Sequence, residues 1–181
     1  MSDILLAALR IGNLFLASAN VIVAFALLAY VASHNLRSPV AQGFCALISF
    51  VLIVFAGDVV LANVTSLESA ALWMHAQWLG IAFVPAAYLH FSDALLRTTG
   101  LSSPWRRRAV AGGYAAGAVF FLLSVFTEWL VYDGVQESIV FHCRAGPLIW
   151  AFAFYYFAAT VWGVYNIHQA RSRCLTSTSR R

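Results

Sequence analysis

Charged residues are scarce in this sequence. They make up 10% of its 181 residues, whereas hydrophobic residues make up 62%. Soluble globular domains contain about 25% charged residues, so this composition, with a mean hydropathy of +0.80, excludes an ordinary soluble domain. The length accommodates five membrane spans of roughly 20 residues each, together with their connections. The sequence therefore predicts an all-α polytopic transmembrane helix bundle.

Catalytic signatures are also missing. The sequence contains no Gly-rich phosphate loop, no GxSxG and no HExxH, the patterns of nucleotide-binding proteins, α/β-hydrolases and zinc proteases. Cys45, Cys143 and Cys174 are scattered without a CxxC pair, which argues against a disulfide framework. His142 beside Cys143 offers two metal ligands without a second pair, too few for a zinc site. We expect no catalytic residue, metal or cofactor within these residues.

Five apolar runs are present, at residues 14–32, 40–62, 71–96, 109–130 and 148–167. A signal peptide is the alternative for the first run, but its apolar core is too long and no strongly basic stretch precedes it. Ser38-Pro39 predicts the start of the second helix, since proline suits the first helical turn. We take residues 1–170 as one helical membrane domain and residues 171–181 as a basic cytoplasmic tail, or as the connection to further spans.

Two of these runs have an unusual composition. The fourth opens with small residues (AGGYAAGA, residues 111–118), which allow helices to approach closely in a membrane. Packing within the chain is the favoured interpretation, and a homodimer face is the alternative. The fifth run is rich in Phe, Tyr and Trp. Packing and interfacial belts are favoured there over an apolar ligand pocket.

The arginines are distributed unequally between the connections. Nine of the eleven basic residues fall on one side of the predicted spans, and only Arg10 and Arg144 fall on the other. The positive-inside rule then places the N-terminus outside and the C-terminus in the cytoplasm. The same rule accounts for the net charge of +4 and the pI near 9.3, so no nucleic-acid partner is implied.

The third run combines apolar character with His75, Gln77, His90 and Asp93, and it has Pro85 at its middle. Ionisable side chains at membrane depth usually face a bundle interior or a wet cavity, because exposure to lipid is costly. A proline at mid-span removes one backbone hydrogen bond and kinks the helix. The run is therefore the predicted functional centre of the chain.

Asp58 and His75 form the first candidate pair in this region. Each lies about four residues from the outer end of its helix, so the two lie at similar depth on neighbouring antiparallel helices. A contact between them would respond to protons or to a ligand near neutral pH. The favoured alternative is that both simply reach the headgroup region and are solvated.

His90 and Asp93 are one helical turn apart and are predicted to share a face near the cytoplasmic end. Holding a metal and relaying a proton are alternatives to the favoured role of an interfacial anchor. A haem held by both His75 and His90 is excluded, because 15 residues of helix separate them by roughly 22 Å.

Residues 73–100 contain a distinctive pattern, made up of Trp73, residues 77–82 (QWLGIA, which include Trp78), Pro85, and His90-Phe91, followed by Thr99-Gly100. In this pattern they resemble the N-terminal seven-transmembrane sensory region of bacterial histidine kinases and some diguanylate cyclases. Asp58 falls where that family often places an acidic residue late in its second helix. Elsewhere the likeness is one of hydropathy and covers the first five of seven spans.

The resemblance implies a sensory, ligand-receiving input domain in the bacterial cytoplasmic (inner) membrane, with an extracytoplasmic N-terminus. Its partners would be the lipid bilayer, a second copy in a homodimer, and a cytoplasmic output module in cis or in trans. Two spans of the family pattern and that module are not among these 181 residues, so we expect the chain to be a fragment of a longer protein or to signal through a partner. Candidate sensing or relay residues are Asp58, His75, Gln77, Trp78, Pro85, His90 and Asp93. The rival functions are an accessory subunit of a membrane complex and a small proton or solute transporter.

Overall fold

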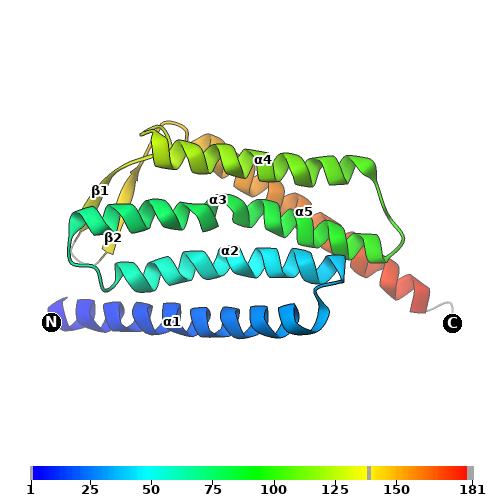
Figure 1. Cartoon of the computed structure of the whole chain (residues 1–181), viewed down its shortest axis with the longest axis horizontal. Helices are drawn as coiled ribbons and strands as arrows, with labels where there is room; N and C mark the ends of the chain where they lie inside the picture. Colours follow the sequence, from blue (N-terminus) through cyan, green and yellow to red (C-terminus); the bar gives the residue numbers. More distant parts are fainter. Residues whose placement is uncertain (1, 138–139, 179–181) are drawn as a thin grey trace.

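The computed structural model describes residues 2–137 and 140–178, with side chains at 4–132 and 144–174. Five helices and one short hairpin make up this part of the chain (Figure 1). The helices are α1 (Ser2–Asn35), α2 (Pro39–Leu61), α3 (Leu67–Thr98), α4 (Pro104–Phe126) and α5 (Ile149–Thr178). Strands β1 (Val131–Glu137) and β2 (Val140–Ala145) form the hairpin between α4 and α5.

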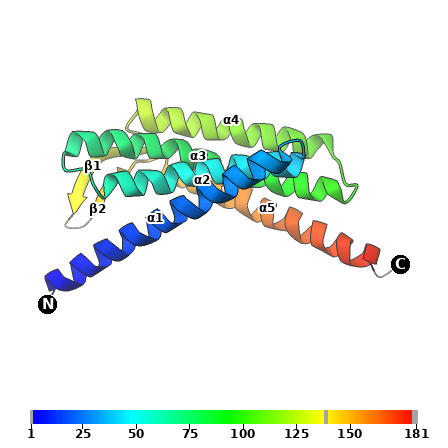
Figure 2. The ribbon, with the colours of Figure 1, turned by 60° about the horizontal axis from the view of Figure 1, so that its bottom comes forward.

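The helices run lengthwise with alternating direction, so the two chain termini lie at opposite ends of the molecule (Figure 1). The N-terminus, the turn between α2 and α3, and the hairpin share what we call the hairpin end. The turn between α1 and α2, the connection from α3 to α4, and the C-terminus share the arginine end. In a turned view, the beginning of α1 and the last part of α5 diverge from the other three helices (Figure 2).

Helix α3 is the centre of this bundle and contacts α2, α4 and α5. Of its most apolar stretch 56% is buried, against 11%, 11% and 17% for α1, α2 and α4. Glycines allow α2 and α4 to approach α3 closely. A Cβ on Gly80 of α3 would lie 2.6 Å from the carbonyl oxygen of Phe50 in α2, and a Cβ on Gly117 of α4 would lie 2.8 Å from that of Ala82 in α3. The sequence-based choice of the third run as the organising element agrees with this arrangement.

Four of the helices, α1 to α4, are long and apolar enough to cross a membrane. Helix α5 is long enough, but among the described residues it does not reach the same hydropathy. Its apolar half contains several Tyr and Trp side chains, which contribute less hydropathy than aliphatic ones, and Asn166 follows. The multi-pass membrane character is thus established by four helices, and the fifth span stays a prediction.

The connection between α4 and α5 differs from the predicted loop. Helix α4 starts at Pro104 and ends at Phe126, about a turn earlier than the predicted end at Leu130. Thr127 adopts extended backbone angles, and the chain then enters the antiparallel hairpin. Leu130 and Val131 are 0% and 4% exposed and pack with Trp78 and Phe152. The sequence therefore stays apolar after the end of α4, because these residues at the base of the hairpin are buried against α3 and α5.

Candidate functional site

The first polar cluster joins α2 and α3 near the hairpin end. The side-chain amide of Gln77 donates to Asp58 Oδ1 at 2.6 Å and to the carbonyl oxygen of Val54 at 2.8 Å. Gly57 makes room for this side chain, since a Cβ there would lie 2.9 Å from Gln77 Cγ. Both amide protons of Gln77 are thereby used, and the half-buried Asp58 has a hydrogen-bond donor from the neighbouring helix.

His75 does not take part in this cluster. In the described part of the chain, no hydrogen bond or ion pair joins it to Asp58, whose partner is Gln77. Residues 75 and 77 are two positions apart, so their side chains leave the helix axis roughly 200° apart. Counting residues from the helix ends, which predicted a similar depth for Asp58 and His75, therefore does not identify the face on which His75 lies. Its Nδ1 atom is buried without a hydrogen-bond partner among the described residues.

Trp78 lies on a further face of α3, toward α5. Its ring packs edge-on against Phe152, with 5.1 Å between the ring centroids, and it is 8% exposed. Leu130 and Val131 at the base of the hairpin complete this apolar cluster. Trp78 thus connects α3 to both α5 and the hairpin, which links the hairpin end to the centre of the bundle.

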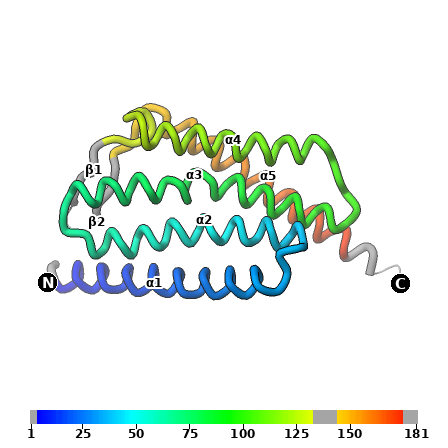
Figure 3. The backbone as a smooth tube through the Cα atoms, viewed as in Figure 1, coloured from blue at the N-terminus to red at the C-terminus, as the bar shows by residue number. Residues whose placement is uncertain are grey.

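Pro85 is buried inside α3, and the second half of the helix slopes away from the line of the first (Figure 3). Because proline has no N–H, the carbonyl of Ile81 loses the donor that a helix normally supplies. At the next residue, the carbonyl of Ala82 lies 3.3 Å from the hydroxyl of Tyr155 in α5. The proline kink therefore lies beside a side-chain hydroxyl that the sequence analysis had not singled out.

The second polar cluster lies at the arginine end. Asp93 is 2% exposed and lies between two guanidinium groups: Oδ2 is 3.1 Å from Arg97 Nε, and Oδ1 is 3.2 Å from Arg106 Nε. These distances are those of ion pairs, although the N–H directions do not meet the geometry of hydrogen bonds. Arg106 also donates to the carbonyl of Leu101 in the connection between α3 and α4. The carboxylate thus links the last turn of α3 to the first of α4.

His90 has a separate partner on α4. Its Nδ1 is 3.2 Å from the hydroxyl oxygen of Tyr114. Buried Ser92 of α3 contacts α5 instead of α4. Its hydroxyl oxygen accepts a hydrogen bond from the side-chain amide of Asn166 at 3.2 Å. Among the residues searched for metal sites, no group of three His, Cys, Asp or Glu side chains is close enough to hold a metal ion. The side chains of His142 and Cys143 lie outside the described residues.

Sequence reasoning missed Tyr155 and Asn166, two residues through which α5 makes polar contact with α3. The signal for Asn166 was present, because an amide that follows a long apolar run is costly unless it is hydrogen-bonded. Tyr155 gave no such signal, since it lies in a helix where every third residue or so is aromatic. Its position becomes informative only when α3 and α4 are placed beside it.

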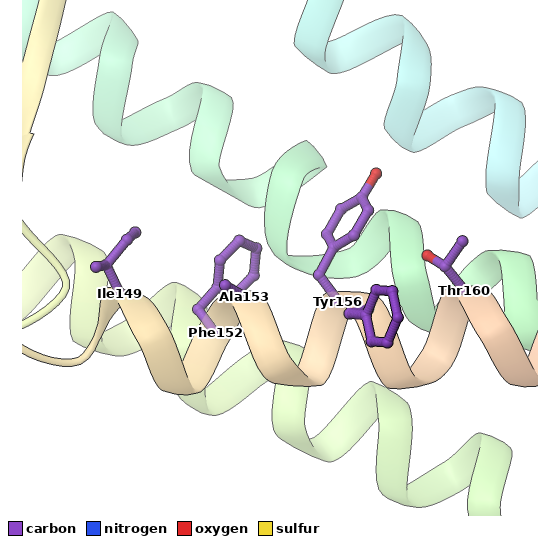
Figure 4. A pocket seen from close by; sticks show the side chains of 6 residues that line it. Ile149, Phe152, Ala153, Tyr156 and Thr160 are labelled. Carbon is purple, nitrogen blue, oxygen red and sulfur yellow. The ribbon is translucent and has the colours of Figure 1, made fainter.

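The aromatic side chains of α5 divide between packing and an open surface. Phe152 and Tyr155 pack with Phe120 of α4 at centroid distances of 5.4 Å. A shallow apolar groove of about 480 Å³ runs along the same helix (Figure 4). Its lining residues are Ile149, Phe152, Ala153, Tyr156, Phe157 and Thr160.

Comparison with known proteins gives a family match. Residues 15–180 match the family described as the N-terminal 7TM region of histidine kinase. Neither a curated protein nor a solved structure matches the chain. The match includes α2 to α5, the hairpin and most of α1, and therefore both polar clusters on α3. The chain belongs to the family of N-terminal 7TM regions of histidine kinases and is a membrane input domain of signal transduction.

Proposed function

We propose that this domain receives a stimulus or ligand in the half near the hairpin end and transmits it along α3 to the arginine end. The observation that carries this proposal is the position of α3, which contacts α2, α4 and α5 and has a polar cluster on each side of Pro85. Gln77 connects α3 to Asp58 of α2 before the proline. Asp93 connects it to Arg106 of α4 after the proline.

The proposed mechanism is a change in packing and not in chemistry. A signalling element needs two arrangements that differ by only a few kcal/mol. The bend at Pro85 allows the two halves of α3 to change angle without breaking further backbone hydrogen bonds. A shift of α2 against α3 at Gln77 would then move the end of α3, where Asp93 holds the beginning of α4. Trp78 and His75 lie in the receiving half, and His90 lies in the transmitting half.

The arrangement in the cell is part of this proposal. The hairpin end is placed outside and the arginine end in the cytoplasm of a bacterial cell, with α5 as the fifth span of the inner membrane. Residues 1–170 form the sensory domain, and residues 171–181 form the connection toward the output module or toward further spans. That module is a histidine kinase or a diguanylate cyclase, joined in cis or in trans, and the domain works as a homodimer. The support is the unequal distribution of arginines together with the family.

Replacing Pro85 with alanine tests the relay. The variant should insert normally, because alanine suits an apolar helix, but it should straighten α3 and change the response of the attached kinase to its stimulus. Autophosphorylation in membrane vesicles, with and without stimulus, measures this response. Pro39→Ala, at the first turn of α2, is the matched control and should leave the response intact. An unaltered response in Pro85→Ala would remove the relay from the proposal.

The relation to the output module is tested by the size of the native polypeptide. An antibody against residues 131–147, applied to membranes of the source cell, detects the protein that contains this domain. A band far above 19.8 kDa would show that the domain is the membrane half of a longer signalling protein. A band at that mass would show that no output module is joined to the domain in cis, and it would favour an accessory subunit over a sensor.

A further inference from the structure

The hydroxyl of Tyr155 lies where three helices meet. It is 3.0 Å from the carbonyl oxygen of Gly113 in α4 and 3.3 Å from that of Ala82 in α3. A tyrosine hydroxyl has a single proton, so it makes a full hydrogen bond to only one of these carbonyls at a time. The two acceptors therefore compete for one donor.

This competition occurs in a contact made of small residues. A Cβ on Gly113 would lie 3.5 Å from the Cβ of Ala86, and a Cβ on Gly117 would lie 2.8 Å from the carbonyl oxygen of Ala82. Helix α4 can approach α3 this closely because Gly117 lacks a side chain, whereas a Cβ on Gly113 would make only an ordinary van der Waals contact. Tyr155 is thus the side chain that brings a hydrogen-bond donor to this contact, in the turn of α3 that contains Pro85.

The ring of Tyr155 is held independently of its hydroxyl. It packs against Phe120 of α4 at 5.4 Å and against Phe152 of its own helix at 6.1 Å between ring centroids. The hydroxyl is therefore presented from a fixed position, and a movement of α3 relative to α4 changes which carbonyl is nearer. A buried hydroxyl needs a hydrogen-bond partner. Since both acceptors are backbone carbonyls, exchanging the bond to Gly113 for the bond to Ala82 changes the free energy little.

We propose that Tyr155 is a positioning residue that sets the packing of α3 against α4 at Pro85 by donating its proton to Gly113 in one arrangement and to Ala82 in the other. The arrangement in the structure favours Gly113, which has the shorter distance. This inference rests on the proposed function, in which α3 bends at Pro85 to transmit a signal. It adds α5 to that relay, since Tyr155 belongs to α5.

The test uses Tyr155→Phe, which keeps the ring and removes the hydroxyl. The sample is the full chain in lipid nanodiscs, with its three cysteines replaced by serine. Spin labels at two exposed residues, Thr98 of α3 and Ala111 of α4, then report the distance between the two helices. We expect one dominant distance with Tyr155, and a broader distribution with a second maximum in the variant. Tyr156→Phe is the matched control, because that neighbouring ring faces the open groove.

The outcomes separate this inference from the function on which it rests. A distance distribution in Tyr155→Phe that equals that of Tyr156→Phe would overturn the role of Tyr155, whatever the kinase response. A broadened distribution together with an unchanged stimulus response in Tyr155→Phe would uphold the positioning role and overturn the relay. A broadened distribution with an altered response would support both.

Discussion

Asp93 is a buried charge whose surroundings account for its position. Its carboxylate is 2% exposed and lies between Arg97 and Arg106, which are 30% and 16% exposed. A carboxylate in an apolar bundle is costly to bury unless cations compensate it. One cation comes from the same helix and the other from α4, so the compensation also joins two helices.

Asp93→Asn should destabilise the domain by about 3 kcal/mol, because two partly buried guanidinium groups would lose the charge that lies between them. The loss is measured as the midpoint of unfolding when the purified domain is titrated with a denaturing detergent. Glu68→Gln is the control, since Glu68 is an exposed acid on the same helix and should have little effect. Equal midpoints for the two variants would contradict this role of Asp93.

Single residues also show what the sequence could and could not specify. Depth along a helix is predicted by counting residues from its end, and that count depends on the helix bounds: α3 begins at Leu67, so His75 lies further from the end of its helix than the count had placed it. The face on which a side chain lies depends on how the helices pack, and Gln77 is on the face toward α2. The polar partners in α4 and α5, namely Tyr114, Tyr155 and Asn166, required the packing as well, because nothing in a single sequence pairs residues so far apart.

At the scale of the elements, hydropathy located the helices, and turn chemistry located some of their ends. Ser38-Pro39 begins α2, as predicted from the preference for proline in the first turn. The hairpin was not predicted, because only Thr127 and Glu128 interrupt the apolar pattern at the end of α4, and Trp129, Leu130 and Val131 then continue it. Leu130 and Val131 are buried at the base of the hairpin. Buried apolar residues occur both at helix ends and in strands, so their apolar character alone cannot distinguish the two.

Close contact between α2 and α3 is expected to depend on Gly80. An alanine Cβ there would lie 2.6 Å from the carbonyl oxygen of Phe50 and 2.7 Å from a methyl group of Val54, so the helices must separate. Overpacking of this kind costs about 1–3 kcal/mol, and Gly80→Ala should lower the detergent unfolding midpoint accordingly. Gly112→Ala on α4, where a Cβ meets nothing within 4 Å, should not lower it. If both variants behave alike, the contact is not limited by Gly80.

At the scale of the whole molecule, the bundle has one well-buried helix and broad apolar surfaces around it. Large hydrophobic side chains of α1 and α5 are exposed, among them Phe15 at 72%, Trp150 at 81% and Phe154 at 74%. Lipid can cover such surfaces at no cost, whereas water cannot. The overall class was therefore predictable from composition, while the central place of α3 required its polar residues to be noticed.

The orientation of the domain leads to the last prediction. Because the connections that contain most of the arginines lie at one end of the bundle (Figure 1), the positive-inside rule predicts that this end lies in the cytoplasm. A single cysteine that replaces exposed Leu67, at the hairpin end, should react with a membrane-impermeant maleimide in spheroplasts whose cytoplasmic membrane is intact. A cysteine at exposed Ser102, at the arginine end, should react only after the membrane is opened. Both measurements use a chain whose native cysteines are replaced by serine. The reverse labelling pattern would show that the orientation is inverted. The Asp93 cluster, with any output that depends on it, would then lie outside the cytoplasm.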